Sequence, residues 1–217
     1  SAGGVFAYSA ASTDPDGRPV RGLSWIGFDL PDRLARLTAG DSFASSTRLG
    51  GGAFVGGLQL ARRFEMDPWL QRTPMPSLSG AAESPSTLEI YVDDVLVRRE
   101  RIDPGVFEIR NLPVTAGSGT TSYVLRDAFG RETRISGTYS VGASLLRAGL
   151  TDYAYTAGFR RERLGFESAA YGDPVFLGAH RVGITDWLTG GARLEAAPDL
   201  VSGGGTVALA APVGLLT

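Results

Sequence analysis

Apolar and polar residues alternate along most of this chain, which is the pattern of β-strands with two different faces. Helical periodicity is scarce. Residues 153–161 show the alternation most clearly, with Tyr153, Tyr155 and Phe159 on one side and Ala154, Thr156 and Gly158 on the other. Similar alternation predicts strands over 26–30, 54–60, 164–170, 182–188 and 207–213. The pattern therefore predicts an all-β chain.

Two kinds of protein fit these alternating strands equally well. Aromatic residues at one end of a strand, opposite small and polar residues, are typical of a transmembrane β-barrel strand with an interfacial aromatic girdle. On that interpretation Tyr153, Tyr155 and Phe159 face lipid. A soluble β-sandwich with aromatic residues on its outer face gives the same alternation. The alternation by itself leaves both open.

The middle of the chain has shorter strands with charged outer faces. They are predicted over residues 87–92, 95–101, 106–110, 121–127 and 132–139. Asp93-Asp94 is expected to form a two-residue hairpin turn, and Gly130 to take a positive φ in the next turn. The apolar positions predict a small sandwich core of Leu88, Ile90, Val92, Val95, Val97, Phe107, Ile109, Leu125 and Ile135.

The change in strand length and in charge along the chain predicts three segments. Barrel-type strands occupy 1–78, an inserted β-sandwich occupies 79–141, and barrel-type strands continue over 142–217. The stretch 72–86 is rich in Pro, Ser and Gly and is interpreted as a linker. Because the middle strands supply their own core, we expect residues 84–139 to fold alone as a soluble domain.

The amino-acid composition excludes several kinds of catalytic and metal-binding residues. The net charge is -2, so there is no general nucleic-acid footprint. All 21 basic residues are Arg and the chain has 0 Cys. These counts exclude Schiff-base lysines, thiolate nucleophiles and Cys-ligated zinc. We expect no cofactor, no metal, no nucleic-acid partner and no small-molecule substrate.

One short motif suggests an enzyme. The "GDSF" stretch, residues 40–43, resembles the nucleophile box of GDS-type esterases, with Ser42 as nucleophile. Its base would have to be His180, the single imidazole in the chain. Those esterases place an Asp three residues before the His, where this chain has Leu177. A turn at a strand end is the favoured interpretation of the motif, and we expect no catalytic residue.

Several motifs in order resemble outer-membrane usher proteins of the chaperone–usher pathway. A barrel strand of that family ends in R-L-T-x-G-D-x-F, and the plug domain carries P-G-P-F-x-I-x-D-L. The first is matched by Arg36, Leu37, Thr38, Gly40, Asp41 and Phe43. The second is matched by Pro104, Gly105, Phe107, Ile109 and Leu112, with Val106 and Asn111 as departures. The resemblance covers nearly the whole chain.

The resemblance implies a central usher fragment: partial barrel strands in the bacterial outer membrane, contacting its lipid, with an inserted plug. In the full-length protein such a segment is a gated channel, not an enzyme. It exports and assembles pilus or fimbrial subunits delivered by periplasmic chaperone–pilin complexes. The rival hypothesis is a soluble β-sandwich module that binds carbohydrate or protein. An esterase acting through Ser42 ranks third.

The gate is expected to involve charged residues of the plug. Arg98, Arg99 and Arg101 form its densest basic strip. Simple alternation puts Arg99 on the face of Val95 and Val97, at the edge of the core, where a long side chain can snorkel. We therefore give Arg98 and Arg101 more weight than Arg99 in the gate.

Overall fold

The computed structural model describes residues 3–13, 16–45, 52–114, 117–142, 144–211 and 214–216. In these residues the regular structure is β-strand, apart from two short 3-10 turns at Pro31–Arg33 and Phe64–Met66. None of the helical segments in the described ranges is long and apolar enough to cross a membrane. The all-β prediction is confirmed.

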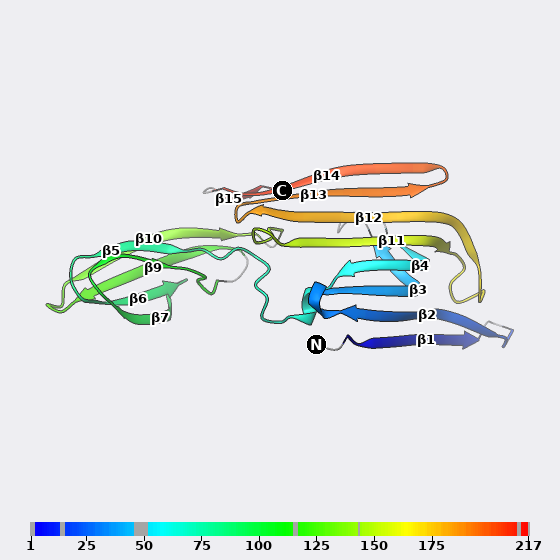
Figure 1. Cartoon of the computed structure of the whole chain (residues 1–217), viewed down its shortest axis with the longest axis horizontal. Coiled ribbons are helices and arrows are strands. Elements are labelled where there is room, and N and C mark those ends of the chain that lie inside the picture. The colour runs from blue at the N-terminus through cyan, green and yellow to red at the C-terminus, as the bar shows by residue number, and fades with distance from the viewer. Residues whose placement is uncertain are drawn as a thin grey trace. The chain divides into compact units, whose positions relative to one another are not determined.

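Nine strands form one long sheet in the order β1-β2-β3-β4-β11-β12-β13-β14-β15 (Figure 1). Pairing along it is antiparallel, as in β3 and β4, where Ala35 lies opposite Arg62 and Ser45 opposite Gly52. The strands are β1 Val5–Thr13, β2 Pro19–Leu30, β3 Ala35–Ser45, β4 Gly52–Arg62, β11 Thr151–Arg161, β12 Tyr171–Thr185, β13 Leu188–Ala197, β14 Leu200–Ala211 and β15 Gly214–Leu216.

The remaining strands form a two-layer sandwich. One layer has the order β10-β9-β6-β7 and the other pairs β5 with β8. The strands are β5 Leu78–Ala82, β6 Ser86–Val92, β7 Val95–Ile102, β8 Gly105–Ile109, β9 Gly117–Asp127 and β10 Glu132–Val141. Its core joins Leu88, Ile90, Tyr123 and Leu125 of the larger layer to Ile109 of the smaller layer and Leu112 beyond it.

The sandwich is inserted between two strands that are neighbours in the long sheet. The chain leaves the sheet after Arg62 and returns at Thr151, yet β4 and β11 pair directly, with Leu60 opposite Tyr155. The chain divides into two compact units, one of residues 1–70, 150–182 and 190–206, and one of residues 71–149, 183–189 and 207–217. The domain limits 79 and 141 stay predictions.

The five short strands of the middle region are confirmed to within a few residues at each end. Asp93 and Asp94 both take positive φ, 47° and 64°, which is the backbone of the expected two-residue hairpin turn. Gly130 has φ 82°, also as expected.

Several sequence predictions about local structure are wrong. The predicted strand 182–188 is interrupted by a turn at Asp186 and Trp187, between β12 and β13. The GDSF stretch, expected to be a turn at a strand end, lies inside β3.

Residues 164–170 are a loop between β11 and β12, in which Gly165 takes a φ of 87°, in the left-handed region. The supposed linker 72–86 contains β5, which belongs to the smaller layer of the sandwich. Val95 and Ile135 are exposed, because both lie on edge strands, and Tyr123 and Leu112 take their place in the core.

Candidate functional sites

One face of the long sheet carries buried polar side chains. Thr38, Gln59 and Thr156 lie side by side on β3, β4 and β11. All three are buried, and the Gln59 Nε2 donates a hydrogen bond of 3.0 Å to the Thr156 Oγ1. We call this the polar face. A buried polar group must have a partner to avoid a large desolvation cost, and this row supplies one across neighbouring strands.

The opposite face of the same strands carries exposed apolar side chains, and we call it the apolar face. One residue along from the polar row, Ala39, Leu58 and Ala157 lie side by side, and Leu58 is 57% exposed. In the next apolar row Phe28 and Leu37 are exposed as well. Burial in this sheet is therefore the reverse of burial in a protein that meets water on its outer face.

The aromatic strand predicted from the sequence lies on the apolar face. Tyr155 belongs to the row of Leu37 and Leu60, and Phe159 is exposed. The Tyr153 ring stacks on the Tyr155 ring at 5.6 Å and on His180 of β12 at 5.9 Å. That lipid covers these rings stays a prediction.

The esterase constellation does not come together in the structure. The His180 Nδ1 is hydrogen-bonded to the Tyr155 hydroxyl at 2.5 Å. Ser42 lies opposite Val55 in the β3–β4 hairpin, and no hydrogen bond joins it to His180 within the described residues. Across the same ranges, no three His, Cys, Asp or Glu side chains gather as a metal site would require.

The outer face of the four-stranded layer carries a network of charged residues. Arg134, Val124, Glu89 and Arg99 form one row across β10, β9, β6 and β7. Glu89 is buried beneath this network; Arg99 pairs with it at 2.7 Å, and the Tyr91 hydroxyl donates to it at 2.8 Å. The hydrogen bond from Tyr91, followed by the charge of Arg99, lowers the pKa of Glu89.

The basic strip of β7 faces differently from the prediction. The β6–β7 register shifts, so that Ile90 lies opposite Arg98 while Tyr91 lies opposite Leu96. Val97 is the extra residue of this bulge, and a bulge reverses the facing of the strand residues beyond it. Arg99 and Arg101 therefore share the outer face with Glu89. Arg98 lies at the core edge beside Ile90 and pairs with Glu100 at 2.9 Å.

Arg99 and Arg101 differ in their partners. Arg99 is held by Glu89. Arg101 lies opposite Thr87, in the row of Arg126, and it has no ion pair among the residues that the structure describes. Arg126 is paired with Glu132 at 2.5 Å. Arg101 is thus a charge on the outer face of the sandwich that can pair with a carboxylate outside the sandwich.

The plug-like motif builds the second layer of the sandwich. Gly105 starts β8 with φ 136°, a conformation that favours glycine. Phe107 meets Tyr123 edge to face at 5.6 Å, and Ile109 and Leu112 are buried in the core. Val106 points away from the core and is almost fully exposed. Pro104 precedes this strand, outside the regular structure.

Sequence reasoning missed the residues that depend on register. Glu89, Arg126 and Arg134 carry no local signal, because only the pairing of β6, β9 and β10 brings them together. A second missed group contains Asp41, Arg161 and Tyr171, which come together from β3, β11 and the start of β12. Asp41 belongs to the first usher-like motif, but Arg161 and Tyr171 lie more than 100 residues away from it in the sequence.

Comparison with known proteins gives one consistent family. The family described as "Outer membrane usher protein" matches residues 21–197. The F1 capsule-anchoring protein of Yersinia pestis is 26% identical over 137 residues, covering 63% of this chain and 16% of that protein. The outer membrane usher protein FocD of Escherichia coli is 30% identical over 135 residues, 62% of this chain and 15% of its own length.

The fold has a counterpart among solved structures. A chain of the E. coli P pilus tip assembly intermediate PapC-PapD-PapK-PapG matches 94% of this chain with a TM-score of 0.56 and 17% identity. At that identity the likeness concerns the fold alone. This chain covers 25% of that chain, and about a sixth of the curated relatives' length.

Proposed function

The chain belongs to the outer membrane usher family, and we propose that it forms the central pore segment of an usher together with the plug of that pore. In the full-length protein this segment exports and assembles pilus or fimbrial subunits that a periplasmic chaperone delivers. The proposal rests on one observation about the insertion. A sandwich with an apolar core and a charged outer face is inserted between two directly paired strands, β4 and β11. These strands belong to a sheet whose polar face is buried and whose apolar face is exposed.

The two faces of the long sheet fit lipid on one side and a polar lumen on the other. Leu58, Phe28 and Phe159 supply the apolar surface that a bilayer requires. The row of Thr38, Gln59 and Thr156 supplies a hydrogen-bonded lining for the other side. We place the segment in the bacterial outer membrane on this ground and on family membership.

Gating follows from the position of the insertion. A domain carried between two adjacent wall strands stays tethered to the pore in any state. In the closed state it occludes the lumen, and binding of a chaperone–subunit complex shifts the population towards the open state. The outer face of the sandwich suits this role, because exposed ion pairs contribute only about 0–1 kcal/mol each and so release readily. No step of this cycle needs a catalytic residue.

Deletion of the sandwich tests the proposal. In the full-length protein, residues 79–141 are replaced by a short Gly/Ser linker and the purified protein is studied in planar bilayers. The pairing of β4 with β11 lets the wall close across the deletion. We expect a large, continuously open conductance in place of brief openings. A protein that needs no detergent to stay soluble, or a deletion without effect on conductance, overturns the proposal in favour of a soluble binding module.

A further inference from the structure

The long sheet has a gap where the β3–β4 hairpin leaves it. Pairing of β2 with β3 ends at Trp25 and Gly40, although β2 begins at Pro19 and β3 runs on to Ser45. Pairing of β4 with β11 ends at Val55. Gly40 has φ 115°, and a Cβ on it would lie 2.4 Å from the Ser24 carbonyl oxygen. The bend therefore requires glycine.

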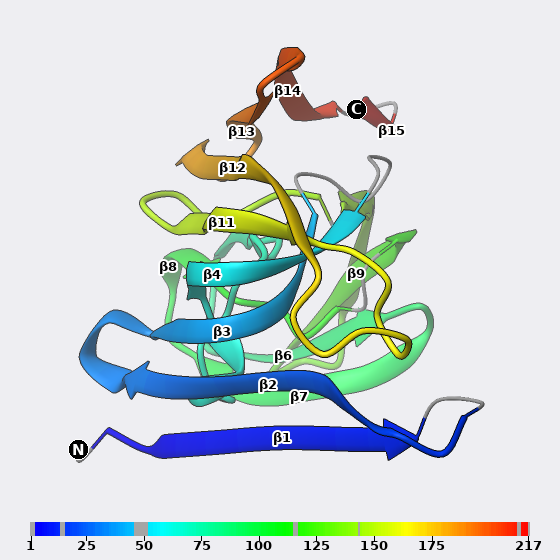
Figure 2. The same cartoon turned by 90° about the vertical axis from the view of Figure 1, so that its right-hand side faces the viewer.

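Beyond the bend, the end of β3 and the start of β4 pack on another part of the sheet. Val55 and Ala44 are buried and form a cluster with Val175 of β12. Leu177 and Ala197 pack against the same cluster. Figure 2 shows the end of β3 and the start of β4 turned away from β2. Among the described residues, the stretch 19–24 of β2 has no strand partner on this side, and neither does Arg161 at the end of β11.

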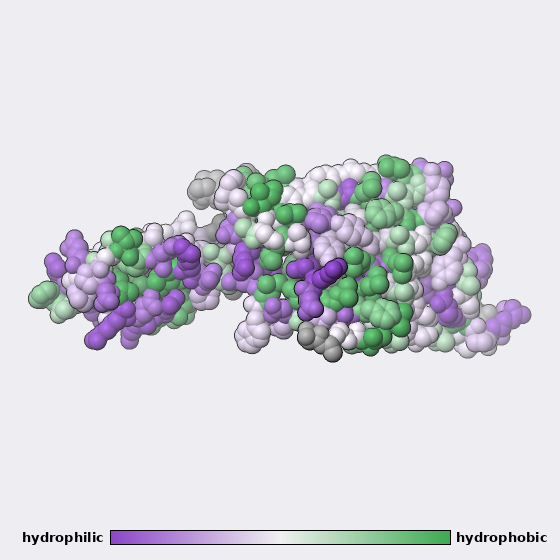
Figure 3. Space-filling model, in the orientation of Figure 1, coloured by the Kyte–Doolittle hydropathy of each residue, from purple (hydrophilic) through white to green (hydrophobic). Residues whose placement is uncertain are grey.

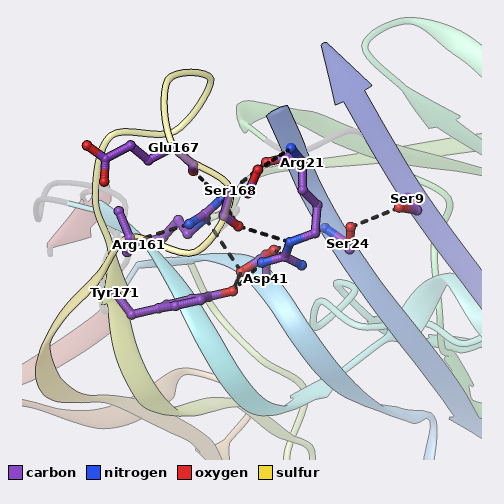
Figure 4. A network of polar contacts seen from close by, with 9 residues as sticks. Ser9, Arg21, Ser24, Asp41, Arg161, Glu167, Ser168 and Tyr171 are labelled. Atoms are coloured by element: carbon purple, nitrogen blue, oxygen red, sulfur yellow. Dashed lines mark hydrogen bonds and ion pairs between the residues drawn. The ribbon is translucent and has the colours of Figure 1, made fainter. Parts of the chain in front are cut away.

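The loop 162–170 fills this gap. The Arg21 backbone N–H donates to the Ser168 Oγ at 3.0 Å, and the Arg21 Nε to the Ser168 carbonyl at 3.1 Å. The buried guanidinium of Arg161 donates to the carbonyls of Arg21, Glu167, Ser168 and Ala170 at 3.2, 3.0, 3.0 and 3.3 Å (Figure 4). Each of these hydrogen bonds joins a side chain to a backbone group, so side chains, and not a strand ladder, hold the loop against β2.

A buried carboxylate stands at the centre of these contacts. Asp41, directly after the bend, is 0% exposed. It accepts hydrogen bonds from the Tyr171 hydroxyl at 2.6 Å and from the Ser24 backbone N–H at 3.1 Å, and it pairs with Arg21 at 3.1 Å. The Arg161 Nε lies 3.9 Å away. We call Arg21, Asp41, Arg161 and Tyr171 the latch.

The latch also fixes the loop sterically. The Tyr171 ring lies under the Arg161 guanidinium at 4.9 Å. The same ring covers Gly56 so closely that a Cβ there would lie 2.2 Å from it. Two glycines, one at the bend and one under the ring, thus make room for the arrangement.

We propose that the loop 162–170 is a wall seal, which closes the gap that the β3–β4 hairpin leaves in the barrel, and that the latch holds it shut. The proposal rests on the proposed pore function. The seal is a second barrier, separate from the sandwich, since all its contacts lie within residues 21–56 and 161–171. Burying the charges of Asp41 and Arg161 costs free energy. Such a cost is justified where the pair fixes one arrangement, and closing the wall in one register is such a use.

The first experiment measures the state of the loop. In the full-length protein, Asp41→Asn removes the charge that holds both arginines, and Arg161→Lys keeps a charge but loses the planar fork that reaches four carbonyls. Both variants should be cleaved by trypsin after Arg163, in the loop, at least about tenfold faster than the parent, since breaking a buried pair exceeds the energy of a tenfold change. Glu167→Gln is the matched control, because it breaks the exposed Arg163–Glu167 pair of the same loop.

The second experiment measures the leak. In planar bilayers, Asp41→Asn and Arg161→Lys should show small additional currents while the large plug-gated openings remain. If deletion of 79–141 opens the large conductance but neither variant leaks nor is cleaved faster, the wall-seal proposal is wrong and the proposed pore function is retained. If the deletion changes nothing, the pore itself is wrong.

A cross-link keeps the test decisive if Asp41→Asn fails to fold. These 217 residues contain 0 Cys, so Arg21→Cys with Ser168→Cys introduces the single cysteine pair of this segment, at two residues in direct contact. The pair should form a disulfide under oxidation, remain tight, and leak when a reductant is added. Absence of the cross-link in a folded protein, or equal currents with and without reductant, overturns the seal.

Discussion

The long sheet and the inserted sandwich use the same alternation in opposite senses. In the sandwich, Leu88 and Ile90 are buried while Arg99 and Arg134 face outward. In the sheet, polar residues such as Thr156 are buried while Leu58 is exposed. Figure 3 shows hydrophilic side chains gathered over the visible face of the sandwich and hydrophobic ones spread over the long sheet.

The contrast means that period-2 alternation determines a strand but not its surroundings. The sandwich has two layers and shields its apolar residues by itself. The sheet is one layer, so its apolar face has to be covered by something outside the chain. Four experiments test how far this contrast holds.

The largest effect is expected from a substitution that leaves a cavity in the core of the sandwich. In a fragment of residues 76–141, which keeps β5 and the bond from the Leu112 N–H to the Pro76 carbonyl, Ile90→Ala should cost about 2–5 kcal/mol in the free energy of unfolding. Ile90 is 0% exposed, so the substitution leaves a cavity. Urea denaturation followed by circular dichroism measures it.

Ile135→Ala is the matched control for this variant. Ile135 lies in the same row of the sheet, beyond Tyr123, but is 48% exposed on the edge strand β10. It should lose less than about 1 kcal/mol. Equal losses at the two positions contradict the assigned core. The shorter fragment 84–139 lacks β5 and should be less stable than 76–141.

The next effect concerns the apolar face of the long sheet. Ala157→Arg puts a charge beside Leu58 and should cost about 2–4 kcal/mol if this face meets the bilayer midplane. Folding of the full-length protein into lipid vesicles, measured by heat-dependent gel mobility in a urea series, gives the cost.

The control for Ala157→Arg has to lie on the polar face of the same strand. Alternation alone suggests Thr156, but this residue is 3% exposed and bonded to Gln59, so an Arg there would break a buried hydrogen bond. Ala154 is the better position, because its neighbours Ala61 and Ala179 are small. Ala154→Arg should be well tolerated. Equal damage at 154 and 157 would mean that the two faces meet the same surroundings.

Acidification should lower the free energy of unfolding of the sandwich, by less than the two substitutions above. Hydrogen bonds from Tyr91, Arg110 and Arg131 lower the pKa values of Glu89, Glu108 and Asp127, respectively. A carboxylate whose pKa is lower in the folded state stabilises the fold above its unfolded pKa and loses this contribution as the pH falls through the folded value. The fragment 76–141 should therefore lose stability below about pH 4.

Thermal unfolding of the fragment at a series of pH values, from neutral down to about pH 2.5, measures this loss. Glu89→Gln should flatten the pH dependence, since it removes one of the three carboxylates whose pKa is lowered in the fold. A melting temperature of the parent that does not change across this range contradicts the role of these pairs.

Sequence alone predicted much of this molecule and failed at identifiable points. Strands were found because alternation is local, and the Asp93-Asp94 turn because its φ values demand such residues. The facing of Arg99 was missed because the bulge at Val97 depends on the partner strand. The loop 164–170 alternates like a strand, but Arg161 and Asp41 hold it in a bent form through contacts that no local pattern encodes.

The smallest expected effect is at the gate, and it rests on the corrected facing of the basic strip. If the sandwich occludes the pore through its outer face, Arg101 is the residue best placed to contact the wall, since it has no ion pair among the described residues of the sandwich. Arg98 is paired with Glu100 at the core edge and should not take part. One exposed pair is worth about 0–1 kcal/mol, so Arg101→Ala should raise the ratio of open to closed time by up to about fivefold in planar bilayers.

Arg98→Ala is the matched control, three residues away on the same strand, and should leave the gate unchanged. Arg99→Ala is not a clean test, because it leaves the buried Glu89 without its ion-pair partner and weakens the sandwich itself. In the parent protein, the ratio of open to closed time should also rise with ionic strength, because salt screens an exposed ion pair. This rise should be smaller in Arg101→Ala, which lacks the pair. A stronger effect from Arg98→Ala than from Arg101→Ala would show that the core edge of β7, not its outer face, meets the wall, and would reverse the orientation of the sandwich in the closed pore.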